Sequence, residues 1–217
     1  MSRQLKKITY KANGKAELLF DDKTKLKVSH NIALELNLRS EMKIDDETMN
    51  RLNSLNHTEK CRKKLLDYLS RRPHGRTELR RKLLRSQDFS KDLVESLLMD
   101  AEQQGLIDDL EFTRLFVEDS LRLRRQDGPG KIKNRLFQKG IKAAIIDQVL
   151  GEMAEEPEDQ YEKVKELALK KWRTYKSNLE LHKRKARLYR FLVSRGFSSQ
   201  QVGKVVAEVS RQTGEME

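Results

Sequence analysis

Residues 108–150 read DDLEFTRLFVEDSLRLRRQDGPGKIKNRLFQKGIKAAIIDQVL. Ile132 and Leu136 are four residues apart, so they share one face of a helix. Gly128-Pro129 interrupts the apolar pattern before them, because proline cannot continue the hydrogen-bond ladder of a preceding helix. Gly140 stands where a residue in the left-handed conformation ends a helix, and an apolar stripe resumes after it. The segment therefore predicts three consecutive helices.

The same arrangement of apolar residues occurs three times along the chain. Leu79, Ile132 and Leu188 begin the three copies, at separations of 53 and 56 residues. Gly140 in the second copy corresponds to Gly196 in the third. The matching apolar positions are Leu79, Leu83, Phe89, Leu93, Val94, Leu97 and Leu98, then Ile132, Leu136, Ile141, Ile145, Ile146, Val149 and Leu150, and then Leu188, Leu192, Phe197, Val202, Val205 and Val206. Chance matches at helical spacing are the alternative, but turn residues recur together with the stripes, which is typical of tandem repeats.

We therefore expect a mainly α-helical protein built from three tandem three-helix repeats. One such unit orders about 50 residues at roughly 1.5 kcal/mol each, whereas each buried anchor contributes only about 1.5–3 kcal/mol. The repeats should therefore stack and stabilise one another. The expected division is an N-terminal extension over 1–56, repeats over 57–107, 108–156 and 157–210, and a frayed tail over 211–217.

The N-terminal extension has a different pattern. Apolar and polar residues alternate between residues 5 and 29, and Asn13-Gly14 is typical of a two-residue hairpin turn. This predicts a small antiparallel β-hairpin or sheet of two or three strands, which is marginal alone and should pack against neighbouring elements. Ser29 and Asp45-Asp46 are predicted to start short helices, and the polar run 53–57 is predicted to separate the extension from the repeats.

Polar residues are also predicted to cap the helices of the repeats. A side-chain oxygen at a helix start accepts from backbone N–H groups that have no partner inside the helix. Asp108-Asp109 is interpreted as a capping pair rather than as paired catalytic carboxylates, because adjacent residues on a helix do not face each other. Pro157, after two glutamates, is predicted to open a further helix. The predicted caps are Thr58, Thr77, Ser90, Asp109 and Ser198.

The chain is strongly basic, with a formal net charge of +12 and a pI near 9.7. The expected partner is a polyanion, either nucleic acid or an acidic protein surface, and a soluble basic protein without such a partner is the alternative. The single Cys61 excludes an intramolecular disulfide and fits a reducing compartment. The sequence has no apolar run of about 18 residues and no signal-peptide pattern, so we expect a cytoplasmic monomer without a membrane partner.

Basic residues recur on each repeat. Lys131, Arg135 and Lys139 are spaced by four and predict a cationic stripe on one helix. The third repeat clusters Lys183, Arg184, Lys185, Arg187 and Arg190. The candidate contacts to DNA or to a protein–DNA filament are Arg81, Lys82, Arg85, Arg122, Arg124, Arg125, Lys131, Arg135, Lys139, Arg184 and Arg187. A solvated face that only keeps the protein soluble is the alternative, and the lack of interleaved aromatic residues argues against sequence-specific reading.

The sequence shows no catalytic or metal-binding pattern. The four histidines are scattered along the chain, and Cys61 has no second cysteine, so neither a metal site nor a cofactor is expected. Gly128-Pro129-Gly130 lacks the Lys-Ser/Thr that phosphate-binding loops use. An enzyme is therefore the least favoured functional class.

Three segments carry a recognisable set of motifs. Gly105-Leu106-Ile107-Asp108-Asp109 precedes a helix that bears an aromatic residue. Gly128-Pro129-Gly130-Lys131-Ile132 leads to Leu136 and Lys139-Gly140-Ile141, and Arg72-Pro73 leads to Glu78-Leu79-Arg80-Arg81-Lys82-Leu83. Together these motifs resemble the bacterial regulatory protein RecX family, closely over 60–150 and more weakly over 157–210. The chain departs from the family pattern at Gln87-Asp88, where glycine is usual.

The resemblance implies an elongated, curved stack of three-helix repeats that binds the RecA recombinase filament. It also implies inhibition of RecA ATP hydrolysis, strand exchange and co-protease activity, in DNA recombination, DNA repair and the SOS response. The RecA filament and single-stranded DNA are therefore the expected partners, and double-stranded DNA is left open. The alternative is a stand-alone DNA- or RNA-binding protein whose units resemble helix-turn-helix modules.

Overall fold

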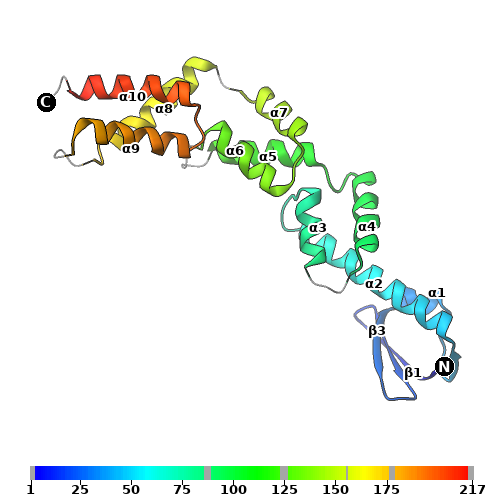
Figure 1. The fold of residues 1–217 in the computed structure, drawn as a ribbon. Coiled ribbons are helices and arrows are strands. Elements are labelled where there is room, and N and C mark those ends of the chain that lie inside the picture. Colours follow the sequence, from blue (N-terminus) through cyan, green and yellow to red (C-terminus); the bar gives the residue numbers. More distant parts are fainter. Residues whose placement is uncertain (1–2, 86–88, 123–126, 155, 176–178, 215–217) are drawn as a thin grey trace. The chain divides into compact units, whose positions relative to one another are not determined.

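The computed structural model describes residues 3–85, 89–122, 127–154, 156–175 and 179–214. These residues form four strands and ten helices, so the fold is mainly α-helical with a small N-terminal sheet, as predicted (Figure 1). None of the helices in these ranges is long and apolar enough to cross a membrane. By its internal contacts the chain divides into two compact units, which are described separately. Unit 1 comprises residues 1–72 and 79–104, and unit 2 comprises residues 73–78 and 105–217.

Unit 1 begins with a four-stranded antiparallel sheet in the order β3-β2-β1-β4. The strands are β1 (Arg3–Lys11), β2 (Lys15–Phe20), β3 (Lys25–Ser29) and β4 (Met42–Ile44). The sheet has four strands where two or three were expected, because β4 has only three residues and shows no alternation in sequence. The expected two-residue hairpin was also wrong. Lys11 pairs with Lys15, so the turn has three residues and ends at Gly14 with φ of +74°.

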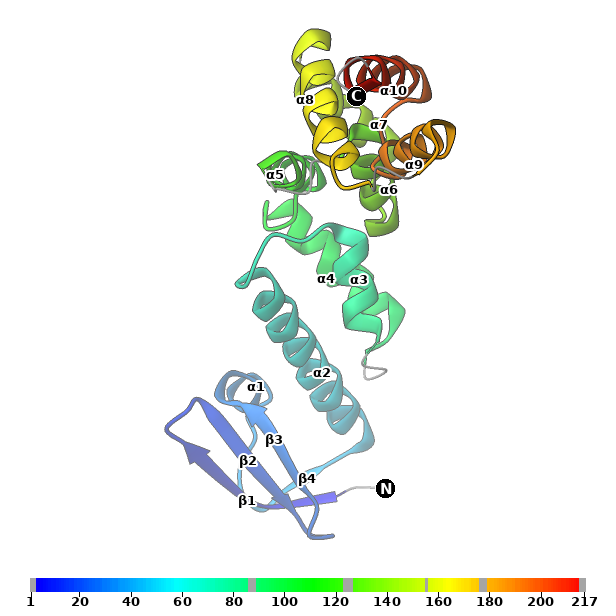
Figure 2. The same ribbon diagram turned by 90° about the vertical axis from the view of Figure 1, so that its left-hand side faces the viewer.

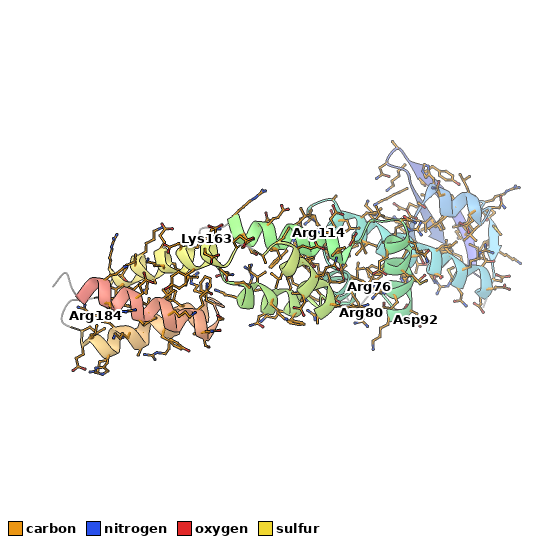
Figure 3. All side chains as sticks on the ribbon, turned by 90° about the horizontal axis from the view of Figure 1, so that it is seen from above. Arg76, Arg80, Asp92, Arg114, Lys163 and Arg184 are labelled. Atoms are coloured by element: carbon orange, nitrogen blue, oxygen red, sulfur yellow. The ribbon has the colours of Figure 1, made fainter. Side chains whose placement is uncertain are left out.

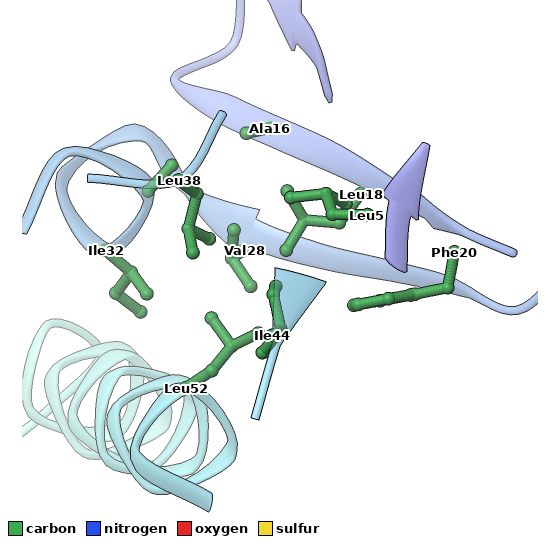
Figure 4. Packing of buried hydrophobic residues seen from close by; sticks show 10 residues of the cluster. Leu5, Ala16, Leu18, Phe20, Val28, Ile32, Leu38, Ile44 and Leu52 are labelled. Carbon is green, nitrogen blue, oxygen red and sulfur yellow. The ribbon is translucent and has the colours of Figure 1, made fainter. Parts of the chain in front are cut away.

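One face of the sheet is buried against the first two helices, α1 (His30–Glu35) and α2 (Asp46–Leu69) (Figure 2). Leu5, Leu18 and Val28 project from the strands and meet Ile32 of α1 and Leu52 of α2 (Figure 4). Burying this face stabilises a sheet that would be marginal alone, as expected.

Helix α2 runs without a break through the polar segment that was predicted to be a boundary. Asp45 caps its start by accepting from the Thr48 N–H at 2.8 Å. Thr58 does not begin a new helix, since its hydroxyl donates to the Ser54 carbonyl one turn earlier. Asparagine and serine are weak helix formers, but the buried residues of α2 recur at intervals of four or five and hold the helix together. These residues are Leu52, Asn56, Cys61 and Leu65. The expected boundary at 56–57 therefore lies inside one helix.

The first trio of helices combines α2 with α3 (Arg76–Leu84) and α4 (Lys91–Gln103). Ser90 caps α4 as predicted, accepting from the Leu93 N–H. The predicted apolar anchors Leu79, Leu83, Val94, Leu97 and Leu98 are all buried. Gln87-Asp88, the departure from the family pattern, lies outside the described residues.

Unit 2 contains two further trios, each around its own apolar core. The second trio is α5 (Asp109–Arg122), α6 (Pro129–Lys139) and α7 (Ala143–Glu152), and the third is α8 (Pro157–Trp172), α9 (Leu181–Ser194) and α10 (Ser199–Gly214). Ile132, Leu136, Ile146 and Val149 centre the second core, and Leu188, Leu192, Val202 and Val205 centre the third. These are the apolar positions that the repeat predicted, and their burial confirms the repeat. Pro157 at the start of α8 and the Ser198 cap of α10 are confirmed as well.

Candidate nucleic-acid interface

The end of α6 carries a left-handed glycine that contacts the start of α3. Gly140 has φ of +84°, and the Ile141 N–H returns to the Leu136 carbonyl, as expected for this helix ending. The Thr77 hydroxyl donates to the Gly140 carbonyl at 3.2 Å. A Cβ added at Gly140 would overlap the Thr77 side chain. The prediction that Thr77 caps its own helix was wrong, because its hydroxyl instead bonds the Gly140 carbonyl at this contact within unit 2.

The two aspartates before α5 have separate capping roles. Asp108 caps α5, since its carboxylate accepts from the N–H groups of Leu110 at 2.7 Å and Glu111 at 3.1 Å. The Asp109 carboxylate accepts instead from the Arg76 N–H at 2.8 Å, at the start of α3. The capping interpretation is therefore right for the pair, but the predicted cap of α5 was one residue off. Because Asp109 caps a helix 33 residues earlier in the chain, no local pattern could reveal its role.

The same kind of contact recurs between the start of α6 and the end of α9. Gly196 has φ of +89°, and a Cβ added there would overlap the backbone nitrogen of Lys131. The N–H groups of Gly128 and Gly130 donate to the carbonyls of Arg195 at 2.7 Å and Gly196 at 3.0 Å. Amides at a helix start and carbonyls at a helix end have no partners inside their own helices. The two ends therefore satisfy each other, and we call this contact the glycine joint.

A buried carboxylate lies beside the glycine joint. Asp127, whose side chain is 3% exposed, receives Lys131 Nζ at 2.9 Å, Arg135 Nη1 at 3.4 Å and Arg195 Nη1 at 3.4 Å. Burial alone would raise the pKa of Asp127, but the hydrogen bonds and positive charges of Lys131 and Arg195 outweigh it and lower the pKa below its usual value. Asp127 thus ties α6 to the end of α9 through charge.

The predicted stripe on α6 is engaged inside the molecule. Lys131 and Arg135 bind Asp127, and Lys139 Nζ lies 3.1 Å from a Glu78 carboxylate oxygen. The Arg135 guanidinium also lies 4.9 Å from the centre of the Phe116 ring, and the Lys139 ammonium lies 5.6 Å from it. The three side chains share one face, as the spacing predicted. Because these side chains are paired inside the molecule, replacing all three would also weaken the fold.

The other predicted contact residues divide by exposure. Arg81, Arg85, Arg122 and Arg187 are exposed, Lys82 is half-buried over the Tyr68 ring, and Arg122 pairs with Glu118 at 3.8 Å. Arg184 is only 8% exposed and lies 6.0 Å from the Trp172 ring centre, so it belongs to the third core (Figure 3). Arg124 and Arg125 lie outside the described residues.

An open cationic stripe remains on α9. Lys183, Arg187 and Arg190 are exposed and spaced by four and three residues, so they share one face of the helix. Lys183 pairs with Glu180 at 3.1 Å, and the Arg190 guanidinium donates to the Ala186 carbonyl. We call these three residues the α9 stripe. Unlike the α6 residues, they contact no buried acid in the part of the chain that the structure describes, so an anion can approach them from solvent. Among the described residues, no three histidine, cysteine or acidic side chains gather as metal ligands would.

The trios match known domains in sequence. Family models described as the second and the third three-helix domain of RecX match residues 108–150 and 158–206. The regulatory protein RecX of Prosthecochloris aestuarii is 34% identical over 152 residues, covering 70% of this chain and 95% of that protein. The chain belongs to the RecX family.

Other RecX proteins extend the likeness to more of the chain. The regulatory protein RecX of Limosilactobacillus reuteri is 29% identical over 189 residues, covering 87% of this chain and 70% of that protein. A crystal structure of regulatory protein RecX superposes with a TM-score of 0.70 at 28% identity, covering 94% of this chain and 98% of that one. The RecX fold therefore includes both the trios and most of the N-terminal extension of this chain.

We predict that Gly196→Ala destabilises unit 2 by about 3 kcal/mol or more, because the variant adds left-handed strain and a clash at the glycine joint. Chemical denaturation followed by the fluorescence of Trp172, the single tryptophan, measures this loss. Gly203→Ala is the matched control, since a Cβ there meets nothing within 4 Å. In a helix interior that change should stabilise by up to about 1 kcal/mol. Equal changes in stability from Gly196→Ala and Gly203→Ala would show that the close backbone contact at the glycine joint does not form.

We predict that Asp127→Asn lowers the free energy of unfolding by about 1–3 kcal/mol at pH 7, because three cations lose their common carboxylate. The pKa of Asp127 is lowered in the folded state. Its stabilisation is therefore complete above the unfolded value of about 3.9 and is lost as pH falls through the lower folded pKa. The difference in free energy of unfolding between the wild type and Asp127→Asn should disappear below about pH 4.

Denaturation curves at several pH values check this prediction. The exposed Asp119→Asn is the control, and we expect it to change stability by less than about 0.5 kcal/mol. A gap between wild type and Asp127→Asn that stays constant down to acid pH would show that the charge of Asp127 is not what holds the joint.

Proposed function

We propose that this RecX-family protein binds the RecA filament on single-stranded DNA and inhibits RecA ATP hydrolysis, strand exchange and co-protease activity. The observation that carries the proposal is family membership, shown by its second and third three-helix domains and by the likeness to a solved RecX structure. The formal net charge of +12 supports an anionic partner. Under this proposal the protein acts in the cytoplasm as a monomer and needs no cofactor.

The repeated trios fit a partner that is itself periodic. In unit 2 the second and third trios are joined by paired helix ends at the glycine joint, so their spacing is fixed by hydrogen bonds. A fixed spacing between similar surfaces suits a filament whose protomers also recur at a fixed distance. We propose that the second and third trios contact neighbouring protomers or the DNA between them. Both binding in the filament groove and capping of the growing end are compatible with this arrangement.

The α9 stripe is the cationic surface that we assign to the filament. Its side chains reach solvent, whereas Lys131 and Arg135 would have to leave Asp127 before they could bind phosphate. Asp127 is buried, so the loss of these partners would leave its charge less well compensated, which disfavours their release. Arg81, Arg85 and Arg122 are exposed as well, and we propose that they too contact the filament.

RecA ATPase activity on single-stranded DNA tests the proposal. The wild-type protein should slow hydrolysis at stoichiometric amounts or below. A chain in which Lys183, Arg187 and Arg190 are replaced by glutamine should need several-fold more protein for the same inhibition, since ionic contacts to phosphate are lost. The matched control replaces three exposed lysines of the sheet, Lys6→Gln, Lys7→Gln and Lys43→Gln, and removes the same charge. We call it the sheet control and expect it to inhibit like wild type.

The outcomes distinguish a failure of the proposed function from a failure of the assigned binding surface. Absence of any slowing by the wild-type protein would reject the proposal. Full inhibition by the α9 variant would remove the α9 stripe from the interface but leave the function in place. Tight binding to one duplex sequence with no effect on RecA would instead support the stand-alone nucleic-acid-binding alternative.

A further inference from the structure

A groove of about 550 Å³ lies in unit 1 between strand β3 and helix α2. The sheet contributes Lys15, Lys25 and Lys27 to its walls, and α2 contributes Asn56, Lys60 and Lys63. No residue of this groove was among the predicted contacts, because its two walls are more than 25 residues apart in sequence and neither carries a nucleic-acid-binding motif.

The groove is strongly cationic. Its five lysines are all exposed, and the acidic residue that lines it is Glu59. Lys25 lies 3.5 Å from the Glu17 carboxylate, whereas Lys27, Lys60 and Lys63 have no acidic side chain within 4.0 Å in the described chain. Like charges gathered without counterions repel each other, so this arrangement is costly unless an anion offsets it.

Protection of the sheet edge explains only part of this charge. β3 is an edge strand, and lysines on an edge strand discourage pairing with another chain. That accounts for Lys25 and Lys27. It does not account for Lys60 and Lys63, which lie on a helix and line the same groove from the opposite side.

The groove also carries hydrogen-bonding groups. Asn56 lines it, and 5% of this residue is exposed. The outer edge of β3 adds backbone N–H groups that do not pair with β2. Backbone and side-chain N–H groups are common donors to phosphate oxygens.

An exposed aromatic ring lies beside the hairpin whose turn lines the groove. Tyr10 is 50% exposed, and its ring lies 4.9 Å from the imidazole of His30. His30 is fixed to the groove wall, since its backbone N–H donates to the Gly14 carbonyl and its Nε2 lies 3.0 Å from the Lys15 carbonyl. An accessible aromatic face next to a cationic groove is the arrangement that binds unpaired bases.

We propose that this groove binds single-stranded nucleic acid. Lys27, Lys60 and Lys63 attract the phosphates, Asn56 donates to the backbone, and an unpaired base stacks on Tyr10. A duplex fits the site less well because its paired bases offer no face to Tyr10. The proposal concerns unit 1 and does not depend on any action on RecA.

Binding of a fluorescein-labelled oligothymidylate, followed by anisotropy without RecA, tests the groove. In the groove variant, Lys27, Lys60 and Lys63 are replaced by glutamine, and the sheet control removes the same charge from elsewhere on the sheet. We expect the groove variant to bind about fivefold more weakly or worse, with a log K versus log salt slope flatter by about 2, since each single-strand phosphate contact contributes about 0.7. The sheet control should match wild type. Equal weakening by both variants, or by neither, would overturn the proposal.

Two substitutions of Tyr10 test the proposed stacking contact. Tyr10→Ala should weaken oligothymidylate binding about fivefold or more, whereas Tyr10→Phe keeps the ring and should bind like wild type. Circular dichroism melting curves confirm that each variant is folded. A labelled duplex that binds as tightly as the single strand, with the same loss in the groove variant, would contradict the single-strand preference. An oligoglutamate peptide that binds in the groove, with no oligothymidylate binding, would assign it to an acidic protein segment and overturn the proposal.

Discussion

The glycine joint is the constraint on which the arrangement of unit 2 depends. The amides at the start of α6 and the carbonyls at the end of α9 are groups that no helix can satisfy internally. They meet because Gly196 turns the chain through a left-handed conformation and leaves no side chain between the two backbones. Gly140 repeats this geometry against Thr77. Each joint adds an ion pair from the residue before the glycine, Lys139 to Glu78 and Arg195 to Asp127.

This arrangement explains why basic residues in this chain have two different roles. Lys131, Arg135 and Arg195 surround one buried carboxylate, and Arg184 lies over Trp172, so these cations hold trios together. The α9 stripe and the groove lysines lie on the surface, and they carry the excess positive charge toward solvent. A net charge alone cannot distinguish the two roles, because a paired and an exposed lysine count equally. We therefore assign binding only to cations without a buried acidic partner.

Features set by local spacing were predicted from the sequence, whereas features set by contacts between distant segments were missed. The three helical trios, the buried anchors and the left-handed turn at Gly140 arise from periodicity and glycine placement, and the structure has them. Asp109 was assigned to the wrong helix because its partner, the Arg76 N–H, is distant in sequence. The break near Thr58 was wrong because buried contacts override the low helix propensity of asparagine and serine. The groove beside β3 forms only when the sheet and α2 pack together.

Amide hydrogen exchange at Gly128 and Gly130 tests the glycine joint most directly. These residues occupy the N-cap and the first turn of α6, where amides have no acceptor inside their own helix and normally exchange fast. The structure gives each of them a carbonyl acceptor from the end of α9. We expect both amides to be protected in the intact protein to the same degree as the interior of α6. Exchange at the rate of an unstructured peptide, with the α6 interior still protected, would show that the joint does not form.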